Sequence, residues 1–241
     1  MGPRSLGGPM DVAGCELPDD RLYDLEHEVW WRAEDDGRSA RVGVMSTFGA
    51  FAGPFRELVF RPVDGIVGAG RSVATVESVR LTGAVRLPCD AELLERNPDV
   101  VRRPRLLNDA PYTDGWVVRV RPTDVPVPPS AGLESAAAIA GRLDERIRRR
   151  RIRCWPRTPE VELSEIGLEC SAVIVKLNEE LARRAVGEAV LLVTDDPTSP
   201  IEMVRWSDQT GHPVLAHRRE GELHQFLVQR SDGSGRRRRG P

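Results

Sequence analysis

The sequence is poor in several residue types, and each shortage excludes a class of function. Of 241 residues 35 are basic, and a single one of these is a lysine, Lys176. Chemistry that needs a lysine amine elsewhere in the chain is therefore excluded. Runs of about 18 or more uncharged apolar residues are absent, which excludes a membrane-spanning helix. The first residues lack the apolar segment of a secretory signal, so we predict a cytoplasmic protein.

The cysteines and histidines lack the spacing of a metal site. The cysteines are Cys15, Cys89, Cys154 and Cys170, and they form no CxxC pair. We therefore expect neither a zinc site nor a disulfide scaffold. Three of the four histidines gather near the C-terminus without close ligand spacing: His212, His217 and His224. The sequence predicts that the protein binds no metal.

The first half of the chain is predicted to consist of short strands, and both ends of the whole chain are predicted to be flexible. Residues 1–20 are rich in Gly, Pro and Asp, which predicts a flexible leader, and residues 231–241 predict a disordered basic tail. Residues 21–124 contain short apolar runs separated by Gly, Pro and Asp. In one of them Trp116, Val118 and Val120 alternate with other residues, which is the period of a half-buried strand.

The second half has a different pattern. Residues 125–158 begin Pro-rich and continue with helix formers, which predicts a linker and a connecting helix. Residues 159–230 follow the order βαβαββ, with a helix from Cys170 to Ala185 that Gly187 ends. This order predicts a two-layer α/β sandwich. The fold class is therefore α+β, with two unlike domains.

The segment from Tyr23 to Asp124 resembles the H protein of the glycine cleavage system. The matching residues follow the family's order: Tyr23, Glu26, His27 and Glu28, then Trp30 and Trp31, Val42-Gly43-Val44, Val76-Glu77-Ser78-Val79, Pro88, Asn97, Leu107-Asn108-Asp109, Pro111-Tyr112 and Gly115-Trp116. The resemblance implies a flattened β-barrel or β-sandwich of the lipoyl/biotinyl type. It also implies a hairpin turn whose lysine, after Glu-Ser-Val, carries lipoate.

That lysine is replaced by Arg80. Lipoate attachment is an amide on a nucleophilic amine, whereas a guanidinium stays protonated and is not interchangeable with lysine. We therefore expect no lipoate at Arg80 and no other cofactor. Arg80 is either a solvated turn residue or a residue whose planar guanidinium binds an anionic group of a partner through paired hydrogen bonds. Cys89 and His27 are read as structural residues, with a thiol carrier as the alternative for Cys89.

Residues from about Glu160 to Arg230 resemble the TusA/SirA family of sulfur-carrier proteins. The resemblance lies in Gly167-Leu168-Glu169-Cys170, in Gly187-Glu188 and in Val190-Leu191-Leu192-Val193-Thr194-Asp195-Asp196-Pro197. It implies that Cys170 receives and passes on a sulfane sulfur as a persulfide.

The chemistry expected at Cys170 is physically reasonable, although the motif is incomplete. A cysteine in the first turn of a helix faces free N–H groups and the positive end of the dipole, which stabilise a thiolate. Ser171 and Val173 stand where the family has prolines, and Glu169 opposes thiolate formation. Cys170 is thus either a working sulfur acceptor or a buried apolar cysteine.

The sequence leads to one hypothesis and two alternatives. The leading hypothesis is a protein of sulfur metabolism, in which a non-lipoylated, non-catalytic H-like domain docks partners and a TusA-like domain relays sulfur on Cys170. Its activity would be at most that of a sulfurtransferase or sulfur carrier. The expected partners are other sulfur-transfer or lipoate-dependent proteins. The alternatives are a non-catalytic scaffold or regulator and a true glycine-cleavage carrier. Arg148–Arg151 and Arg236–Arg239 predict solvated or disordered segments rather than a nucleic-acid site.

Overall fold

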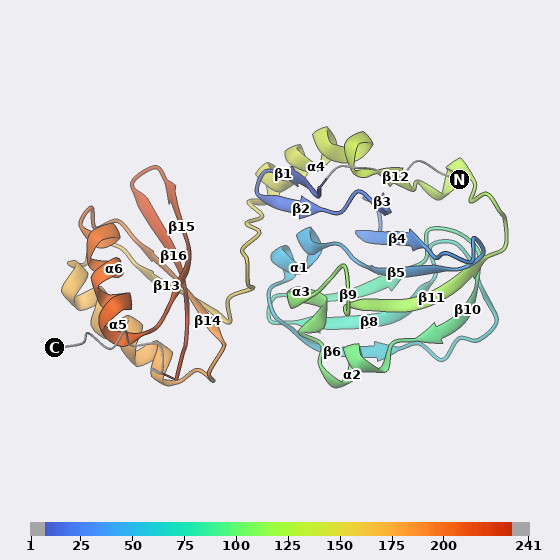
Figure 1. Ribbon diagram of the computed structural model, residues 1–241. Helices are drawn as coiled ribbons and strands as arrows, with labels where there is room; N and C mark the ends of the chain where they lie inside the picture. The colour runs from blue at the N-terminus through green and yellow to red at the C-terminus, as the bar shows by residue number, and fades with distance from the viewer. Residues whose placement is uncertain (1–7, 233–241) are drawn as a thin grey trace. The chain divides into compact units, whose positions relative to one another are not determined.

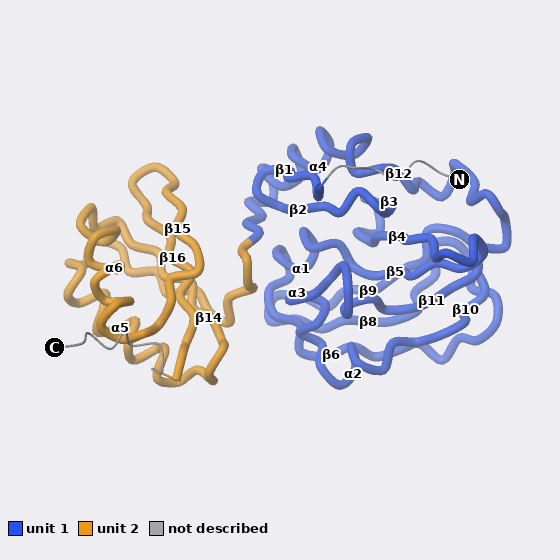
Figure 2. Tube along the Cα trace, in the orientation of Figure 1, with its two compact units in different colours: residues 1–154 blue, residues 155–241 orange. Residues whose placement is uncertain are grey.

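The structure, a computed structural model, describes residues 8–232 of the chain. The chain divides into two compact units, residues 1–154 and residues 155–241 (Figure 2). The division falls inside the stretch 125–158 that the sequence marks as a linker. Most of the predicted tail, from residue 233 onward, lies outside the described residues, as do the first seven residues of the predicted leader.

The first unit consists mainly of short strands (Figure 1). Its strands are β1 (Met10–Val12), β2 (Cys15–Leu17), β3 (Leu22–Asp24), β4 (Val29–Ala33), β5 (Ala40–Val44), β6 (Phe55–Phe60), β7 (Ile66–Val67), β8 (Ser72–Ser78), β9 (Thr82–Arg86), β10 (Ala91–Arg96), β11 (Trp116–Pro122) and β12 (Glu134–Ser135). Its helices are α1 (Ser46–Ala52), α2 (Pro98–Arg102), α3 (Leu106–Asp109) and α4 (Ala136–Arg150), with a 3₁₀ turn at Pro129–Ala131.

These strands form a flattened sandwich, as the resemblance implies. One sheet has the order β12-β3-β4-β5-β11-β10-β7, and the other has the order β6-β8-β9. Apolar side chains from both sheets share one core: Val42, Val44, Val118 and Val120 from the first, and Val73, Val76 and Val85 from the second. Burial of these alternating positions stabilises the sandwich.

Strand β11 departs from the predicted alternation at one point. Val117 and Val118 are both fully buried, although neighbours in a regular strand face opposite sides. The pairing with β5 shifts register between Trp116 and Val118, which marks a β-bulge or a related irregularity. Such a bulge turns an extra side chain inward, and a period of two does not reveal it.

Helix α4 belongs to the first unit and is not part of a separate linker. Ser135 caps its N-terminus, where the Oγ atom accepts a hydrogen bond of 3.3 Å from the N–H of Ala138. Ile139, Leu143 and Ile147 recur every four residues, are buried, and pack in a cluster with Trp30. The sequence predicts a connecting helix in 125–158, and the structure packs this helix against the first unit, because one face of the helix has a core to cover.

The expectation of no disulfide is wrong. Cys15 and Cys154 are joined, with their Cα atoms 5.2 Å apart and 139 positions apart in sequence. The bond ties the antiparallel hairpin β1–β2 to the chain just beyond α4, so the described part of the predicted leader is ordered.

The second unit has the predicted order βαβαββ. Its elements are β13 (Val161–Glu165), α5 (Cys170–Ala182), β14 (Ala189–Thr194), α6 (Ser199–Thr210), β15 (Val214–Glu220) and β16 (Leu223–Gln229). The sheet order is β13-β14-β16-β15, with β13 and β14 parallel and the other pairs antiparallel. Figure 1 shows α5 and α6 on the same side of this sheet. The fold is the expected two-layer α/β sandwich.

Helix α5 ends before the residue that the sequence predicts. Val173, Leu177 and Leu181 are buried against the sheet, as their spacing indicates. The helix stops at Ala182, and the N–H of Arg184 bonds to the carbonyl of Leu181 in a tighter turn. Ala185 therefore lies outside the helix, since termini often tighten before the glycine that closes them.

Candidate functional site

The turn between β8 and β9 is the place where the H-protein resemblance puts the carrier lysine. Ser78 holds this turn, because its buried hydroxyl lies 2.9 Å from the carbonyl of Ala52 and 3.0 Å from that of Leu81. The Ser78 Oγ atom also accepts hydrogen bonds from the N–H groups of Arg80 and Leu81. The backbone of the carrier turn is thus firmly fixed.

Arg80 occupies the tip of this turn. Its side chain is exposed, and its Nη1 atom donates a hydrogen bond of 3.4 Å to the carbonyl of Phe51. The preceding residue, Val79, is 57% exposed. The turn therefore presents a residue to solvent, but that residue offers a guanidinium and no amine nucleophile.

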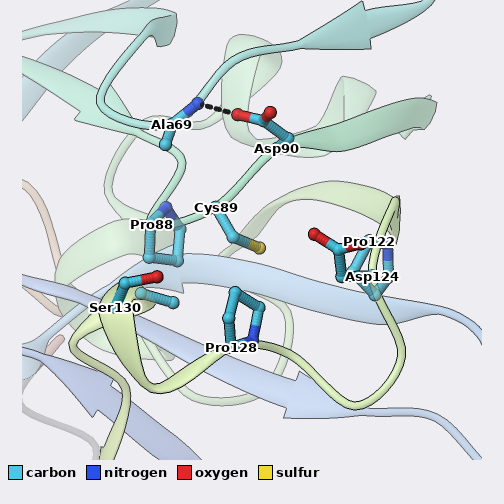
Figure 3. A pocket seen from close by; sticks show the side chains of 9 residues that line it. Ala69, Pro88, Cys89, Asp90, Pro122, Asp124, Pro128 and Ser130 are labelled. Carbon is cyan, nitrogen blue, oxygen red and sulfur yellow. Dashed lines mark hydrogen bonds between the residues drawn. The ribbon is translucent and has the colours of Figure 1, made fainter.

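Cys89 lies farther along, between β9 and β10, at the edge of a small pocket (Figure 3). The pocket has a volume of about 200 Å³, and Asp90 and Asp124 also line it. Burial raises the pKa of the Cys89 thiol to about 11, and these two carboxylates add to the effect. A thiol with so high a pKa is a poor nucleophile at neutral pH, which favours the structural reading of Cys89.

His27 makes a local contact that agrees with a structural role. Its Nδ1 atom lies 2.5 Å from Oδ2 of Asp24, and the other carboxylate oxygen accepts hydrogen bonds from the N–H groups of Glu26 and His27. Asp24 is buried, and the imidazole of His27 is a hydrogen-bond partner for this buried carboxylate.

Cys170 is the first residue of α5, as its sequence position predicts. The residue is 7% exposed, and its backbone N–H donates a hydrogen bond of 2.6 Å to Oδ2 of Asp196. A first-turn N–H group is one of the unsatisfied donors of a helix end. Here a carboxylate of the same unit satisfies it.

Asp196 connects the N-terminal ends of two helices. Its Oδ2 atom binds the first N–H of α5, and its Oδ1 atom accepts hydrogen bonds of 2.7 Å from both the N–H and the hydroxyl of Thr198, just before α6. These hydrogen bonds, those of Thr198 above all, hold the pKa of the Asp196 carboxyl below its ordinary value. The electrostatic effect of His224 adds a smaller lowering. The carboxylate is therefore ionised at neutral pH.

The surroundings of Cys170 oppose its ionisation. Burial raises the pKa of the Cys170 thiol above its ordinary value, and the negative charges of Asp196 and Glu202 raise it further. Ser199, the first residue of α6, is also buried, and its hydroxyl has no hydrogen-bond partner. The sequence marked Asp196 as part of the TusA resemblance but did not connect it with Cys170, because 26 positions separate the two.

The structure brings together two of the three C-terminal histidines. His217 Nε2 lies 3.0 Å from His224 Nδ1, and the His217 ring stacks on Phe226 with centroids 4.4 Å apart. Burial and the neighbouring His224 lower the pKa of His217. His212 lies apart from this pair and contacts Ser231.

Within residues 8–232, groups of three or more His, Cys, Asp or Glu side chains in a metal-binding arrangement are absent. The helices of that same range are too short or too polar to cross a membrane. Two arginines of the run at the end of α4 form ion pairs with acidic side chains, Arg148 with Asp144 and Arg150 with Glu28. The run Arg236–Arg239 lies outside the described residues.

Two family models match the chain. The model described as glycine cleavage H-protein matches residues 21–144, and the model described as sulfurtransferase TusA matches residues 162–230. The first match reaches into α4, in agreement with the place of that helix in the first unit. The second match includes Cys170 and Asp196.

Similar proteins are also found among known sequences and structures. Glycine cleavage system H protein 3 of Aquifex aeolicus is 36% identical over 120 residues, which are 50% of this chain and 74% of the relative. Glycine cleavage system H protein 5 of the same organism is 37% identical over 117 residues, 47% of this chain and 78% of the relative. A crystal structure of a glycine cleavage system H protein from Mycobacterium marinum is 28% identical, has a TM-score of 0.46, and is matched over 53% of this chain and 98% of its own. The chain belongs to the glycine cleavage H-protein family, and a TusA domain is fused behind its H-protein domain.

Proposed function

We propose that the protein transfers sulfur, with the TusA domain carrying sulfane sulfur on Cys170 and the H-protein domain docking partner proteins without carrying lipoate. The family matches join a lipoyl-type carrier fold to a sulfur-carrier domain. One observation carries the proposal. Of the two positions where these folds place a reactive group, the thiol at Cys170 is retained and the amine at position 80 is replaced by arginine.

The proposed step at Cys170 is a transfer between two sulfur atoms. The Cys170 thiolate attacks the outer sulfur of a donor persulfide, and the S–S bond of the donor breaks. A new S–S bond forms on Cys170, and the donor leaves as a thiolate that takes up the proton lost by the Cys170 thiol. The sulfane sulfur moves without net oxidation or reduction.

The proposed role of the H-protein domain is recognition. Its carrier turn keeps the backbone bonds made by Ser78, and Arg80 is exposed at the tip. A guanidinium can form paired hydrogen bonds with a carboxylate or phosphate of a partner. The partners proposed are sulfur-transfer or lipoate-dependent proteins.

A loading assay on the full chain tests the sulfur transfer. The protein is incubated with a cysteine desulfurase and cysteine, and its mass is then measured under non-reducing conditions. We expect the mass of one added sulfur atom in the parent protein and in Cys89→Ser, and no addition in Cys170→Ala. An unmodified parent, or an adduct that persists in Cys170→Ala, contradicts the proposal.

A non-catalytic scaffold is the second candidate, and the burial of Cys170 favours it. A thiol that is 7% exposed and whose pKa is raised is a weak acceptor for sulfur. If the protein is a scaffold, Cys170→Ala leaves partner capture and cellular phenotype unchanged. Loss of a sulfur-dependent phenotype in Cys170→Ala, with normal partner capture, excludes the scaffold.

A further inference from the structure

We propose that Asp196 is a positioning residue that keeps the Cys170 thiol neutral, because its carboxylate occupies the place at the N-terminus of α5 where a thiolate would be stabilised. The inference rests on the proposed sulfur transfer at Cys170. It adds a residue that controls when that thiol can react.

The geometry of the Asp196 carboxylate supports this role. Its Oδ2 atom lies 2.6 Å from the backbone nitrogen of Cys170, and its Oδ1 atom is held by the two donors of Thr198. Both carboxylate oxygens are therefore engaged, one at each helix end.

The positive end of α5 is already in contact with a negative charge. Helix N–H groups and the helix dipole stabilise a negative charge at the first turn, which is why cysteines there are often reactive. Here an ionised carboxylate already accepts the first N–H. A thiolate on Cys170 would thus meet a like charge at this helix end.

One other charged group raises the pKa of the thiol. Glu202, in the first turn of α6, is the second carboxylate that acts on Cys170. His224 of β16 interacts with Asp196, and the imidazole of His217 lies 3.0 Å from that of His224. The two carboxylates raise the pKa of the thiol, and burial of Cys170 raises it most.

The consequence for sulfur transfer is a thiol that rests in its unreactive form. Ionisation is favoured when the Asp196 carboxylate is neutralised or drawn away, for example by a cationic group of a sulfur donor that binds beside the helix. The proposal therefore assigns the donor a basic surface at this point.

The chain offers a matched control for the test. Asp195 is the neighbour of Asp196, and its carboxylate accepts a hydrogen bond from the N–H of Gly167 rather than from Cys170. Asp195→Asn removes one negative charge next to the site without touching the first turn of α5. In a Cys89→Ser background Cys170 is the one free thiol, because Cys15 and Cys154 are bonded to each other.

The experiment measures the rate of alkylation of Cys170 by iodoacetamide as a function of pH, in the full chain. In the parent we expect the midpoint of the curve above pH ~8.5, the value of an ordinary thiol. Asp196→Asn keeps an oxygen that can accept the N–H of Cys170 and should lower the midpoint by about one pH unit. The rate at pH 7 should rise about 3-fold, because lower basicity offsets part of the gain in thiolate.

Two further variants complete the test. Asp196→Glu retains the charge and should keep the midpoint high, whereas Asp196→Ser removes the charge with a shorter side chain and should lower it. Asp195→Asn should leave the midpoint nearly unchanged. A parent midpoint at or below that of an ordinary thiol overturns the inference. So does an equal shift in Asp195→Asn, or an unchanged midpoint in a folded Asp196→Asn or Asp196→Ser.

The outcome is separable from that of the proposed function. Alkylation reports on the acidity of the thiol whether or not the protein carries sulfur. If the midpoint shifts as expected but no sulfur is loaded, Asp196 controls a thiol that has another use. If sulfur is loaded but the midpoint does not shift, the transfer stands and the role of Asp196 is wrong.

Discussion

The two carrier positions of this protein have diverged in opposite ways. In the first unit the turn at Ser78–Leu81 is held by several hydrogen bonds and presents an exposed side chain, but the reactive amine is replaced by Arg80. In the second unit the thiol of Cys170 is present, but it is buried and its first-turn N–H is bound by Asp196. The first unit therefore keeps an exposed turn but has lost the reactive amine, whereas the second unit keeps the thiol but buries it.

The difference has a physical basis in how strongly a substitution at each position disturbs the packing. A hairpin tip is exposed, so a change from lysine to arginine there leaves the packing of the sandwich untouched. The first turn of α5 belongs to a layer that covers the sheet, and Val173 of the same turn lies in the core. A cysteine at that turn is a small apolar side chain that packs well even when it does not react.

The largest expected effect comes from restoring the amine at the carrier turn. Arg80→Lys, incubated in the full chain with a lipoate ligase and lipoate, should gain one lipoyl amide, whereas the parent gains none. The reason is that a lysine amine can be acylated and a guanidinium cannot. Mass spectrometry and an anti-lipoyl antibody provide the measurement.

The control for this experiment concerns the other lysine. Lys176 is bonded to Glu165 by a 2.7 Å ion pair in the second unit, so Lys176→Arg should leave the result unchanged. Lipoylation of the parent chain, or an Arg80→Lys protein that stays unmodified, would contradict the view that the turn is intact and lacks only the amine.

The next largest effect concerns the disulfide, which only the first unit contains among the described residues. Replacing both Cys15 and Cys154 by serine should lower the free energy of unfolding of that unit by about 2–5 kcal/mol, since the bond closes a long loop. Denaturant titration with a tryptophan signal measures it. Dithiothreitol should destabilise the parent similarly and the double variant no further; an equal loss in both would show that the bond is not the cause.

A smaller effect is expected at the carrier turn itself. Ser78→Ala removes the hydroxyl that bonds to the Ala52 and Leu81 carbonyls, and should cost about 1–3 kcal/mol of stability. In an Arg80→Lys background it should also reduce lipoylation. Ser72→Ala on the same strand loses a single bond to Ala74 and should cost less. Equal losses in the two variants would mean that Ser78 does not hold the turn.

Much of the architecture could be predicted from local patterns, and the misses are instructive. The order βαβαββ and the buried stripe of α5 follow from periodicity that each element carries within itself. The bulge at Val117 and Val118 and the early end of α5 depend on neighbouring elements, so periodicity misses them. The stretch 125–158 is rich in proline and arginine, and its packing against Trp30 cannot be read from its own residues.

The candidate site divides in the same way. That Cys170 begins a helix could be read from the residues around it, and so could the arginine at position 80. The burial of Cys170 could not be predicted, because it depends on how α5 and α6 cover the sheet. The bond to Asp196 joins residues 26 positions apart, and the two lie together because β13 and β14 are parallel, so that the end of β14 lies beside the chain that leads from β13 into α5.

The sequence by itself determined which chemistry is available: with one lysine, Lys176, the carrier turn has no amine, whatever the fold. Tertiary structure alone decided the environment of each of the four cysteines. It joined Cys15 to Cys154 across 139 positions, placed Cys89 beside a small pocket, and set an ionised carboxylate at the N–H of Cys170. The physical reason is that composition limits the functional groups, whereas burial and neighbouring charge, which set their reactivity, arise only from packing.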